Sequence, residues 1–275
     1  MDLVTEPRAL ERLRGSALVP TMGALHEGHA ALIRRAAALG GPVVVSLFVN
    51  PTQFGPDEDY QRYPRTIDAD LEVARRSGAD AVFAPAATAI YPEDAPVAVP
   101  PLPKVALTPR LEDACRPTHF AGVCQVVARL FDLVAPRYAV FGEKDYQQLL
   151  VVTAMVADQA PRWRELRIEP HPTVRESDGL ALSSRNRYLA AEQREQALGL
   201  SRALRVAHAA QRPETAERMM RDTLEAHELA VEYAVVRDAT TLMPVAGFDR
   251  PTRALIAARL GAVRLIDNAA MTVWR

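Results

Sequence analysis

The stretch that decides the fold is ALVPTMGALHEGHAALIRRAAALGGPVVVSLFV, residues 17–49. It begins and ends with apolar runs of strand length, at 17–21 and 43–49. Between them lie a glycine-containing loop and a segment in which apolar residues recur at helical spacing, and a Gly-Gly-Pro sequence ends that helix. Two strands joined through a helix form a βαβ unit, which predicts a parallel sheet with right-handed crossovers.

The same alternation continues to about residue 170. The pattern predicts further strands at 80–85, 138–142 and 166–174, and helices at 68–77, at 121–134 and from about Asp145. Eight prolines lie from Pro85 to Pro117, which predicts an extended surface excursion of the kind that often forms a lid or wall. The predicted fold class is therefore α/β, with a Rossmann-like parallel sheet and flanking helices.

From about Tyr188 the pattern changes. Amphipathic helices are predicted at 190–210 and 213–227, and antiparallel strands within 231–238 and 252–268. We therefore expect two domains, a larger one over residues 1–178 and a smaller α+β domain over residues 179–275.

Composition excludes several classes of protein. Lys and Arg number 33 against 34 Asp and Glu, with no basic run, so a nucleic-acid partner is not expected. The longest apolar run, 43–49, is interrupted by Ser46 and is far too short to span a membrane. The N-terminus has no signal-peptide core, and two cysteines form neither a disulfide framework nor a zinc cluster. A soluble cytoplasmic protein is expected.

The first candidate site is TMGALHEGH, residues 21–29, at the predicted junction of a strand and a helix. A helix N-terminus attracts phosphate, and Gly23 and Gly28 allow the backbone to approach it closely. His26 and His29 can point the same way and donate to the charge that develops when pyrophosphate leaves. Their spacing differs from that of H-E-x-x-H zinc proteases. Either histidine alone also fits an ordinary loop, but the pair in this setting favours phosphate chemistry.

The second candidate site is GEKD, residues 142–145, directly after a predicted strand. Only two of the 33 basic residues are lysines, Lys104 and Lys144. Lys104 lies in a proline-rich segment and is expected to be solvated. Lys144 stands at a strand end, where ligands of open parallel sheets bind, and can meet a phosphate or carboxylate. Asp145 can accept a hydrogen bond from a ribose hydroxyl or help to hold Mg²⁺. An ordinary surface ion pair is the alternative.

Two further motifs are weaker. LALSSRNRYL, residues 180–189, offers hydroxyls and a guanidinium next to the domain boundary, which suits a mobile phosphate clamp. NPTQF, residues 50–54, follows a strand and carries two amides that can orient a small polar substrate. Each motif by itself also fits a simple turn.

These motifs resemble those of one family. HEGH is similar to the HxGH signature of the nucleotidyltransferase superfamily, and LSSR stands in the place of its KMSKS-type loop. Four segments, with the C-terminal ARLGAVRLIDN, closely resemble the pantothenate synthetase (pantoate–β-alanine ligase) family over nearly the whole chain: NPTQF (50–54), RPTHFAGV (116–123), GEKDYQQL (142–149) and RESDGLALSSRN (175–186).

The resemblance implies an ATP-dependent ligase of coenzyme A precursor synthesis. In that reaction (R)-pantoate and ATP form pantoyl adenylate and pyrophosphate, and the amine of β-alanine then displaces AMP to give pantothenate. The resemblance also implies a first domain that binds ATP and pantoate, a second that acts as a lid, and a homodimer.

The implied site residues follow by motif. ATP is bound by Met22, Gly23, Ala24, Leu25, His26, Glu27, Gly28 and His29, by Gly142, Glu143, Lys144 and Asp145, and by Val174, Leu182, Ser183, Ser184 and Arg185. The implied catalytic residues are His29 as proton donor, His26 and Lys144.

For the other ligands, Gln53 and Gln148 hold pantoate, Gln53 also contacts β-alanine, and Asn50 supports the reacting groups. Mg²⁺ travels on the triphosphate, with Asp70 as a candidate protein contact. The pocket or subunit contact is implied to include Glu112, Arg116 and His119, whereas Thr118 and Ala121 depart from the family's RPGHFRGV form and leave their own roles open.

Other function classes remain open on the residues alone. A plain nucleotidyltransferase would release a nucleotidylated product, and a requirement for β-alanine distinguishes the ligase from it. A non-enzymatic module would bind ATP without turning it over. The four polar motifs at strand ends argue against this alternative. An aminoacyl-tRNA synthetase is disfavoured by the short chain and the lack of a basic domain. Cys115 and Cys124 are expected to be core or near-core thiols.

Overall fold

A computed structural model describes residues 1–56 and 58–271. The chain forms two compact units. The first contains residues 1–143 and 147–172, and the second contains residues 144–146 and the chain from Thr173 onward. The chain therefore enters the second unit twice, and its last crossing lies before the boundary expected after residue 178.

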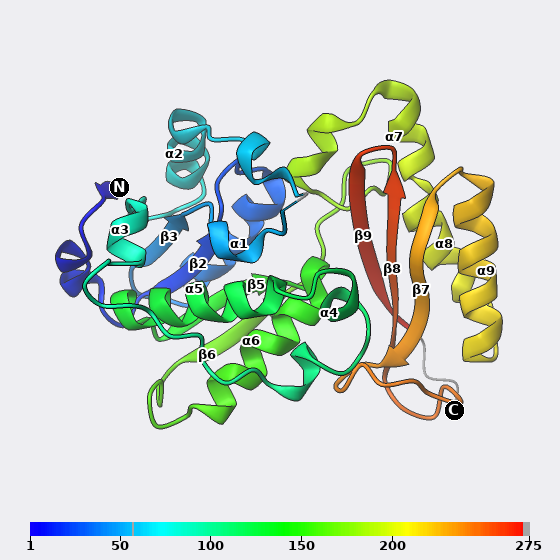
Figure 1. Cartoon of the computed structure of the whole chain (residues 1–275). Coiled ribbons are helices and arrows are strands. Elements are labelled where there is room, and N and C mark those ends of the chain that lie inside the picture. Colours follow the sequence, from blue (N-terminus) through cyan, green and yellow to red (C-terminus); the bar gives the residue numbers. More distant parts are fainter. Residues whose placement is uncertain (57, 272–275) are drawn as a thin grey trace. The chain divides into compact units, whose positions relative to one another are not determined.

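The first unit is built on a six-stranded parallel sheet (Figure 1). The strands are β1 (Asp2–Val4), β2 (Ala17–Thr21), β3 (Val43–Leu47), β4 (Ala81–Phe83), β5 (Tyr138–Gly142) and β6 (Arg167–His171). Their order across the sheet is β1-β4-β3-β2-β5-β6. The predicted α/β class with a parallel sheet is confirmed.

Strand order determines where this sheet offers a binding edge. From β2 the chain proceeds outward through β3 and β4, and it then returns to place β5 on the other side of β2. The topological switch point is therefore between β2 and β5, and ligands of such sheets bind beyond the carboxyl ends of the strands at that point. The HEGH loop follows β2, and the GEKD motif follows β5.

The edge strand β1 is not among the strands predicted from the sequence. It pairs in parallel with β4, from Asp2 opposite Ala81 to Val4 opposite Phe83. Only Val4 of its three residues is buried. A strand this short has no periodic pattern to detect, because its place is determined by pairing with a partner far away in the sequence.

Helices cover both sides of the first sheet (Figure 1). They are α1 (Glu27–Ala38), α2 (Ile67–Arg76), α3 (Ala87–Ile90), α4 (Glu112–Cys115), α5 (His119–Val134) and α6 (Tyr146–Asp158). Apolar side chains of α1 and α2 pack on the sheet, among them Ile33, Ala36 and Ala74. The predicted proline-rich excursion is confirmed as a largely irregular segment, and α5 anchors it: Gln125 donates to the carbonyl of Val97 at 2.6 Å.

The second unit packs helices on a three-stranded antiparallel sheet. Its elements are α7 (Ala191–Ala197), α8 (Gly199–Ala207), α9 (Pro213–Ala226), β7 (Ala230–Asp238), β8 (Thr252–Leu260) and β9 (Val263–Met271). The single helix predicted at 190–210 is wrong, because it breaks at Leu198. A Cβ on Gly199 would lie 2.8 Å from the Cβ of His227, so this glycine allows α8 to approach the end of α9.

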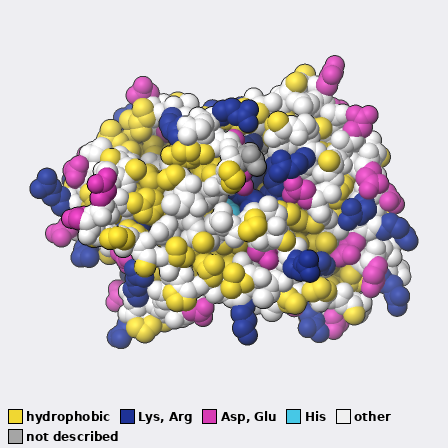
Figure 2. Space-filling view, in the orientation of Figure 1, with side chains coloured by type: hydrophobic (Ala, Val, Ile, Leu, Met, Phe, Trp, Pro, Cys, Tyr) yellow, Lys and Arg dark blue, Asp and Glu magenta, His cyan; other side chains and the backbone are white. Residues whose placement is uncertain are grey.

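Charged side chains of both signs are interspersed over the face shown in Figure 2. Among the described residues, no helix is both long enough and apolar enough to cross a bilayer.

Candidate active site

The HEGH loop is held by a reciprocal cap at the start of α1. His26 is the N-cap residue, and its Nδ1 accepts a hydrogen bond from the backbone N–H of Gly28 at 3.1 Å. The Nδ1 of His29 in turn accepts from the N–H of His26 at 3.3 Å. The two rings lie 4.0 Å apart, centroid to centroid. The two histidines therefore do the work of a capping box.

This cap determines the tautomer of both rings. A ring nitrogen that accepts a backbone hydrogen bond carries no proton, so a neutral imidazole held in this way has its proton on Nε2. His26 and His29 thus each carry an Nε2–H donor beside a helix N-terminus, where the helix dipole favours an anion. Glu27, by contrast, is exposed and forms an ion pair with Arg34.

A buried carboxylate accepts hydrogen bonds from the backbone of the HEGH loop. Asp70 of α2 is 3% exposed and accepts from the N–H groups of Ala24 and Leu25, at 3.1 and 2.7 Å. The hydroxyl of Thr66 donates to the same carboxylate at 3.1 Å. Gly23 has a φ of +86°, and a Cβ there would lie 3.1 Å from Asp70 Oδ2. The carboxylate therefore stabilises the unusual path of the loop.

This geometry makes Asp70→Asn informative. The substitution replaces one accepting oxygen by an amide nitrogen, so we expect the loop to loosen. The KM for ATP, the nucleotide that the resemblance implies for this loop, is expected to rise about tenfold, the scale of one charge-assisted hydrogen bond. The measurement is KM for ATP across a series of Mg²⁺ concentrations, with Asp68→Asn on the exposed face of α2 as control. An unchanged KM for ATP together with weaker activation by Mg²⁺ would instead place Asp70 on the metal.

Asn50 and Gln53 lie together after β3. Asn50 is 1% exposed, and its Nδ2 donates to Gln53 Oε1 at 3.2 Å and to the carbonyl of Gly122 at 3.1 Å. Its Oδ1 accepts from the hydroxyl of Tyr91 at 2.7 Å. Gln53 Nε2 lies 3.2 Å from the sulfur of Met22. The structure thus brings three of the predicted site residues into contact, with Asn50 supporting Gln53.

Helix α5 approaches this segment unusually closely. An added Cβ on Gly122 would lie 2.3 Å from the carbonyl oxygen of Thr52 and 2.5 Å from the backbone nitrogen of Gln53. Only glycine permits this contact, so the short 3-10 turn Pro51–Gln53 has its place fixed by the first turns of α5.

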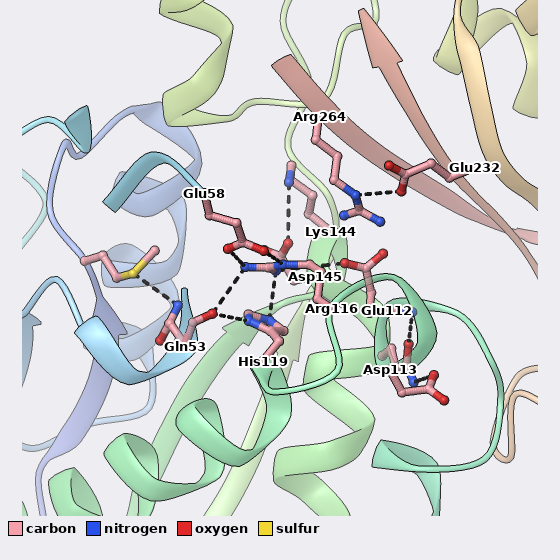
Figure 3. Close-up of polar contacts among 12 residues, drawn as sticks. Gln53, Glu58, Glu112, Asp113, Arg116, His119, Lys144, Asp145, Glu232 and Arg264 are labelled. Carbon is pink, nitrogen blue, oxygen red and sulfur yellow. Dashed lines mark hydrogen bonds and ion pairs between the residues drawn. The ribbon is translucent and has the colours of Figure 1, made fainter. Parts of the chain in front are cut away.

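Arg116 links three segments around Gln53 (Figure 3). Its Nε and Nη2 donate to the carboxylate of Glu58, both at 2.7 Å, and its Nη1 lies 3.1 Å from His119 Nε2. Because the guanidinium is only a donor, His119 Nε2 must accept, and Nδ1–H donates to the carbonyl of Gln53 at 3.1 Å. Glu112 is 7% exposed, with a carboxylate oxygen 3.9 Å from Arg116 Nη1.

Burial and charge shift the pKa values of this cluster. Burial, with the positive charge of Arg116, lowers the pKa of His119 to about 4. For Glu58, burial acts to raise the pKa, but the hydrogen bond and charge of Arg116, with smaller contributions from His119 and the backbone, bring it below its ordinary value. The cluster therefore consists of a neutral histidine, a carboxylate and a guanidinium.

These shifts give stability a pH dependence. The pKa of His119 is lower in the folded protein than its unfolded value of about 6.5, so the unfolded state binds more protons below that pH. We expect about 2 kcal/mol of unfolding free energy to be lost between pH 6.5 and 4.5 through this group. The contribution of Glu58 is lost only at lower pH, as its depressed pKa is approached. Urea unfolding of the wild type and His119→Asn across this range measures the difference, and parallel curves would contradict the prediction.

The glutamines of α6 differ in their surroundings. Gln148 is partly buried, whereas Gln147 is 3% exposed and makes three contacts. Gln147 Nε2 donates to the carbonyl of Val105 and to Asp113, both at 2.9 Å, and its Oε1 accepts from the N–H of Glu112 at 2.9 Å. Gln147 therefore anchors the proline-rich excursion, a role that the sequence did not indicate.

In the second unit, the GEKD motif contributes Lys144 and Asp145. The two side chains form an ion pair with Nζ and Oδ1 3.5 Å apart. The carbonyl of Lys144 accepts a hydrogen bond from Asn268 Nδ2 at 2.8 Å. Gly142 and Glu143 belong to the first unit, so the boundary between the units passes through the motif.

The remaining predicted nucleotide residues form a small hairpin in the second unit. The N–H of Leu182 donates to the carbonyl of Val174 at 3.0 Å, and Arg175 pairs with Ala181 in an antiparallel bridge. Ser183 then caps a 3-10 helix (Ser184–Tyr188), its Oγ accepting from the N–H of Arg185 at 3.3 Å. This hairpin brings Val174 next to the LSSR segment.

Sequence reasoning gave no role to several polar residues that shape these sites. Arg175 and Asn268 lie within quoted motifs, whereas no motif marks Glu58 or Tyr91. Glu58, Tyr91, Arg175 and Asn268 each act through a partner distant in the sequence. The expectation for the cysteines was half right. Cys124 is buried, which raises the pKa of its thiol to about 12, but Cys115 is exposed. Among the described residues, no group of three or more His, Cys, Asp or Glu could hold a metal ion.

Comparisons with known proteins identify the same family as the sequence motifs. Residues 3–270 match the model of a family described as pantoate-beta-alanine ligase. A pantothenate synthetase from Nocardioides sp. is 52% identical over 94% of this chain and 80% of the relative. A pantothenate synthetase structure from Thermus thermophilus has a TM-score of 0.92 and 43% identity, covering 98% of this chain and 99% of its own. A pantoate-beta-alanine ligase structure from Francisella tularensis, complexed with beta-gamma ATP and beta-alanine, has a TM-score of 0.78 and 31% identity, covering 98% and 97%.

Proposed function

Because the chain belongs to the pantoate–β-alanine ligase family, we propose that it condenses (R)-pantoate with β-alanine, using ATP and giving pantothenate, AMP and pyrophosphate. A carboxylate is a poor acyl donor. Attack of the pantoate carboxylate on the α-phosphorus of ATP releases pyrophosphate and forms the adenylate, and the amine of β-alanine then displaces AMP from the acyl carbon.

The observation that carries this proposal is the reciprocal histidine cap. It holds His26 and His29 with their Nε2–H groups as donors at the N-terminus of α1, next to the switch point of the sheet. Preorganised donors of this kind stabilise charge that develops in a transition state. We assign them to the phosphate oxygens of ATP, with His29 donating to the departing pyrophosphate.

The second unit would supply the remaining groups for ATP. We assign Lys144 to the negative charge of the phosphate or carboxylate at the reacting centre, since a flexible ammonium suits a point charge. Asp145 would accept from the ribose, and Ser183, Ser184 and Arg185 would hold phosphate oxygens. The backbone of Val174 and Leu182, held together by a hydrogen bond, would border the nucleotide.

Pantoate would be bound by Gln53 and Gln148. Gln53 is held by Asn50 and, through its carbonyl, by His119. Because Asn50, Arg116 and His119 make their contacts within the protein, we assign them to positioning Gln53. β-Alanine would also contact Gln53.

Mg²⁺ would be bound through the triphosphate of ATP. It would neutralise phosphate charge there. The carboxylate of Asp70 already accepts three hydrogen bonds within the protein, which favours a role in supporting the loop. We further propose a cytoplasmic homodimer, for which light scattering of the purified protein gives the oligomeric state.

The exchange of labelled pyrophosphate into ATP tests the proposed order of steps. With Mg²⁺ present and β-alanine absent, we expect exchange that requires pantoate, because the adenylate forms reversibly before the amine enters. Omitting pantoate is the control. Active protein that shows no exchange but releases AMP when β-alanine is added would indicate a concerted ligation. Folded protein that shows neither exchange nor AMP release would favour a different acid. Exchange that does not require pantoate would contradict the proposed order.

A further inference from the structure

Three residues, Lys144–Tyr146, cross into the second unit in mid-chain, and the first and last of them contact the residues of its sheet. Asn268 of β9 donates to the carbonyl of Lys144 at 2.8 Å. The guanidinium of Arg253, from β8, stacks 3.7 Å from the ring centroid of Tyr146. The hydroxyl of Tyr146 donates at 2.8 Å to the carbonyl of Ala239, just after β7.

Asn268 is the centre of this arrangement. It is 4% exposed, and its Oδ1 accepts from Arg253 Nε at 2.6 Å while its Nδ2 donates to Lys144. Both ends of the amide are therefore used, in a place where solvent does not readily replace a lost partner. A buried hydrogen bond of this kind specifies one position of the peptide it holds.

Strand β9, which carries Asn268, is itself held by an ion pair between Asp267 and Arg175. Asp267 is 2% exposed and receives two hydrogen bonds from the guanidinium of Arg175, at 2.7 and 2.9 Å. The N–H of Asn268 donates to Asp267 Oδ1 at 2.7 Å. Arg175 also donates to the carbonyl of Gly179 in the hairpin before LSSR. Side chains of neighbouring strand residues point to opposite faces, so β9 holds Lys144 on one face and the hairpin on the other.

We infer that Asn268 is a positioning residue for the ligase reaction and acts through Lys144. A lysine side chain has four flexible bonds, and it reaches a defined point only if its own backbone is fixed. Asn268 supplies that fixed point by holding the Lys144 peptide. The inference rests on the proposed role of Lys144, and the experiment below separates the two.

The most informative variant is Asn268→Asp. It preserves size and the acceptor for Arg253, whose positive charge favours the carboxylate. It removes the N–H donor and places an oxygen opposite the carbonyl oxygen of Lys144. We expect kcat of pantoate-dependent pyrophosphate exchange to fall about tenfold to a hundredfold, the cost of a small misplacement of a catalytic group. Asn268→Ala removes the donor without placing an oxygen near the carbonyl of Lys144, and it should also lower kcat.

A double-mutant cycle separates positioning from general structural damage. If Asn268 acts through the lysine, its substitution should cost less than about threefold in the Lys144→Ala background, because the side chain it positions is gone. The matched control is Glu217→Ala. Glu217 of α9 accepts from the N–H of Val236 in β7 at 2.8 Å, so its removal weakens the same unit without touching Lys144–Tyr146. This control should lower Tm and leave kcat unchanged.

The outcomes are distinct. A near-wild-type kcat in Lys144→Ala would refute the role of the lysine and the inference with it. An impaired Lys144→Ala together with a near-wild-type Asn268→Asp would refute the inference alone. Losses that multiply in the double variant, or equal losses of kcat in Glu217→Ala, would show that Asn268 acts only on the fold. If Asn268→Asp does not fold, the cycle is run with Asn268→Ala or Asn268→Ser.

Discussion

Replacing His29 with alanine is expected to lower kcat for pantothenate formation about a hundredfold or more, the effect of losing one preorganised donor to developing charge. The structure adds a second consequence. His29 Nδ1 accepts the N–H of His26, so the alanine variant also loses half of the cap on α1. We expect the free energy of unfolding to fall by about 1 kcal/mol, as for other lost N-caps.

Two isosteric variants separate these roles. Asparagine can place its Oδ1 near the position of Nδ1, and glutamine can place its amide N–H near that of Nε2. His29→Asn should therefore keep the stability of the wild type but lose activity, whereas His29→Gln should lose stability and retain more activity. Steady-state kinetics and thermal unfolding of both proteins give the comparison. A fully active His29→Asn would show that no donor is needed at Nε2.

Gly122→Ala is expected to have a large effect for the addition of one methyl group. The new Cβ would lie 2.3 Å from the carbonyl oxygen of Thr52, a backbone atom that cannot swing away as a side chain can. Either α5 or the turn that carries Gln53 must move. We expect a loss of about 2–3 kcal/mol of unfolding free energy, as for other overpacked cores, and at least about a tenfold rise in the KM for pantoate.

Gly55→Ala provides the control for this prediction. Gly55 lies just beyond the same turn, and the nearest atoms to its added Cβ are in the side chain of Glu58 at 3.8 Å, an ordinary contact. This variant should have near-wild-type Tm and KM. Urea unfolding and pantoate titrations of both variants measure the effect, and equal behaviour of the two would contradict the close approach of α5.

Much of the fold could be predicted because its signals are local. The strand β2, its loop, α1 and β3 lie within a continuous stretch whose apolar spacing changes from strand to helix and back. The hairpin of β8 and β9 is local too. The edge strand β1 could not be predicted in this way, because pairing with β4 determines its place. The break at Leu198 lies inside a single run of helical apolar spacing, and Gly199 next to it packs closely against His227.

The residues of the candidate sites also differ in whether a local pattern marks them. Strand-end motifs mark His26, His29 and Lys144, since a strand followed by glycine and polar residues has a recognisable pattern. The residues that hold them in place have no such pattern. Asp70, for example, is one acid among several in α2, and only the folded chain shows that it accepts the N–H groups of the HEGH loop. The contacts of a supporting residue depend on distant partners.

The double entry of the chain into the second unit limits how this part of the protein could be exchanged between relatives. A fragment that begins at Thr173 carries all three strands of the small sheet but not Tyr146 or the carbonyl of Lys144. Without them, Arg253 loses the ring on which it stacks, and the amide of Asn268 loses an acceptor. A chimaera joined at that point would therefore also have to inherit matching residues 144–146. Recombination at one junction is expected to separate residues that have to vary together.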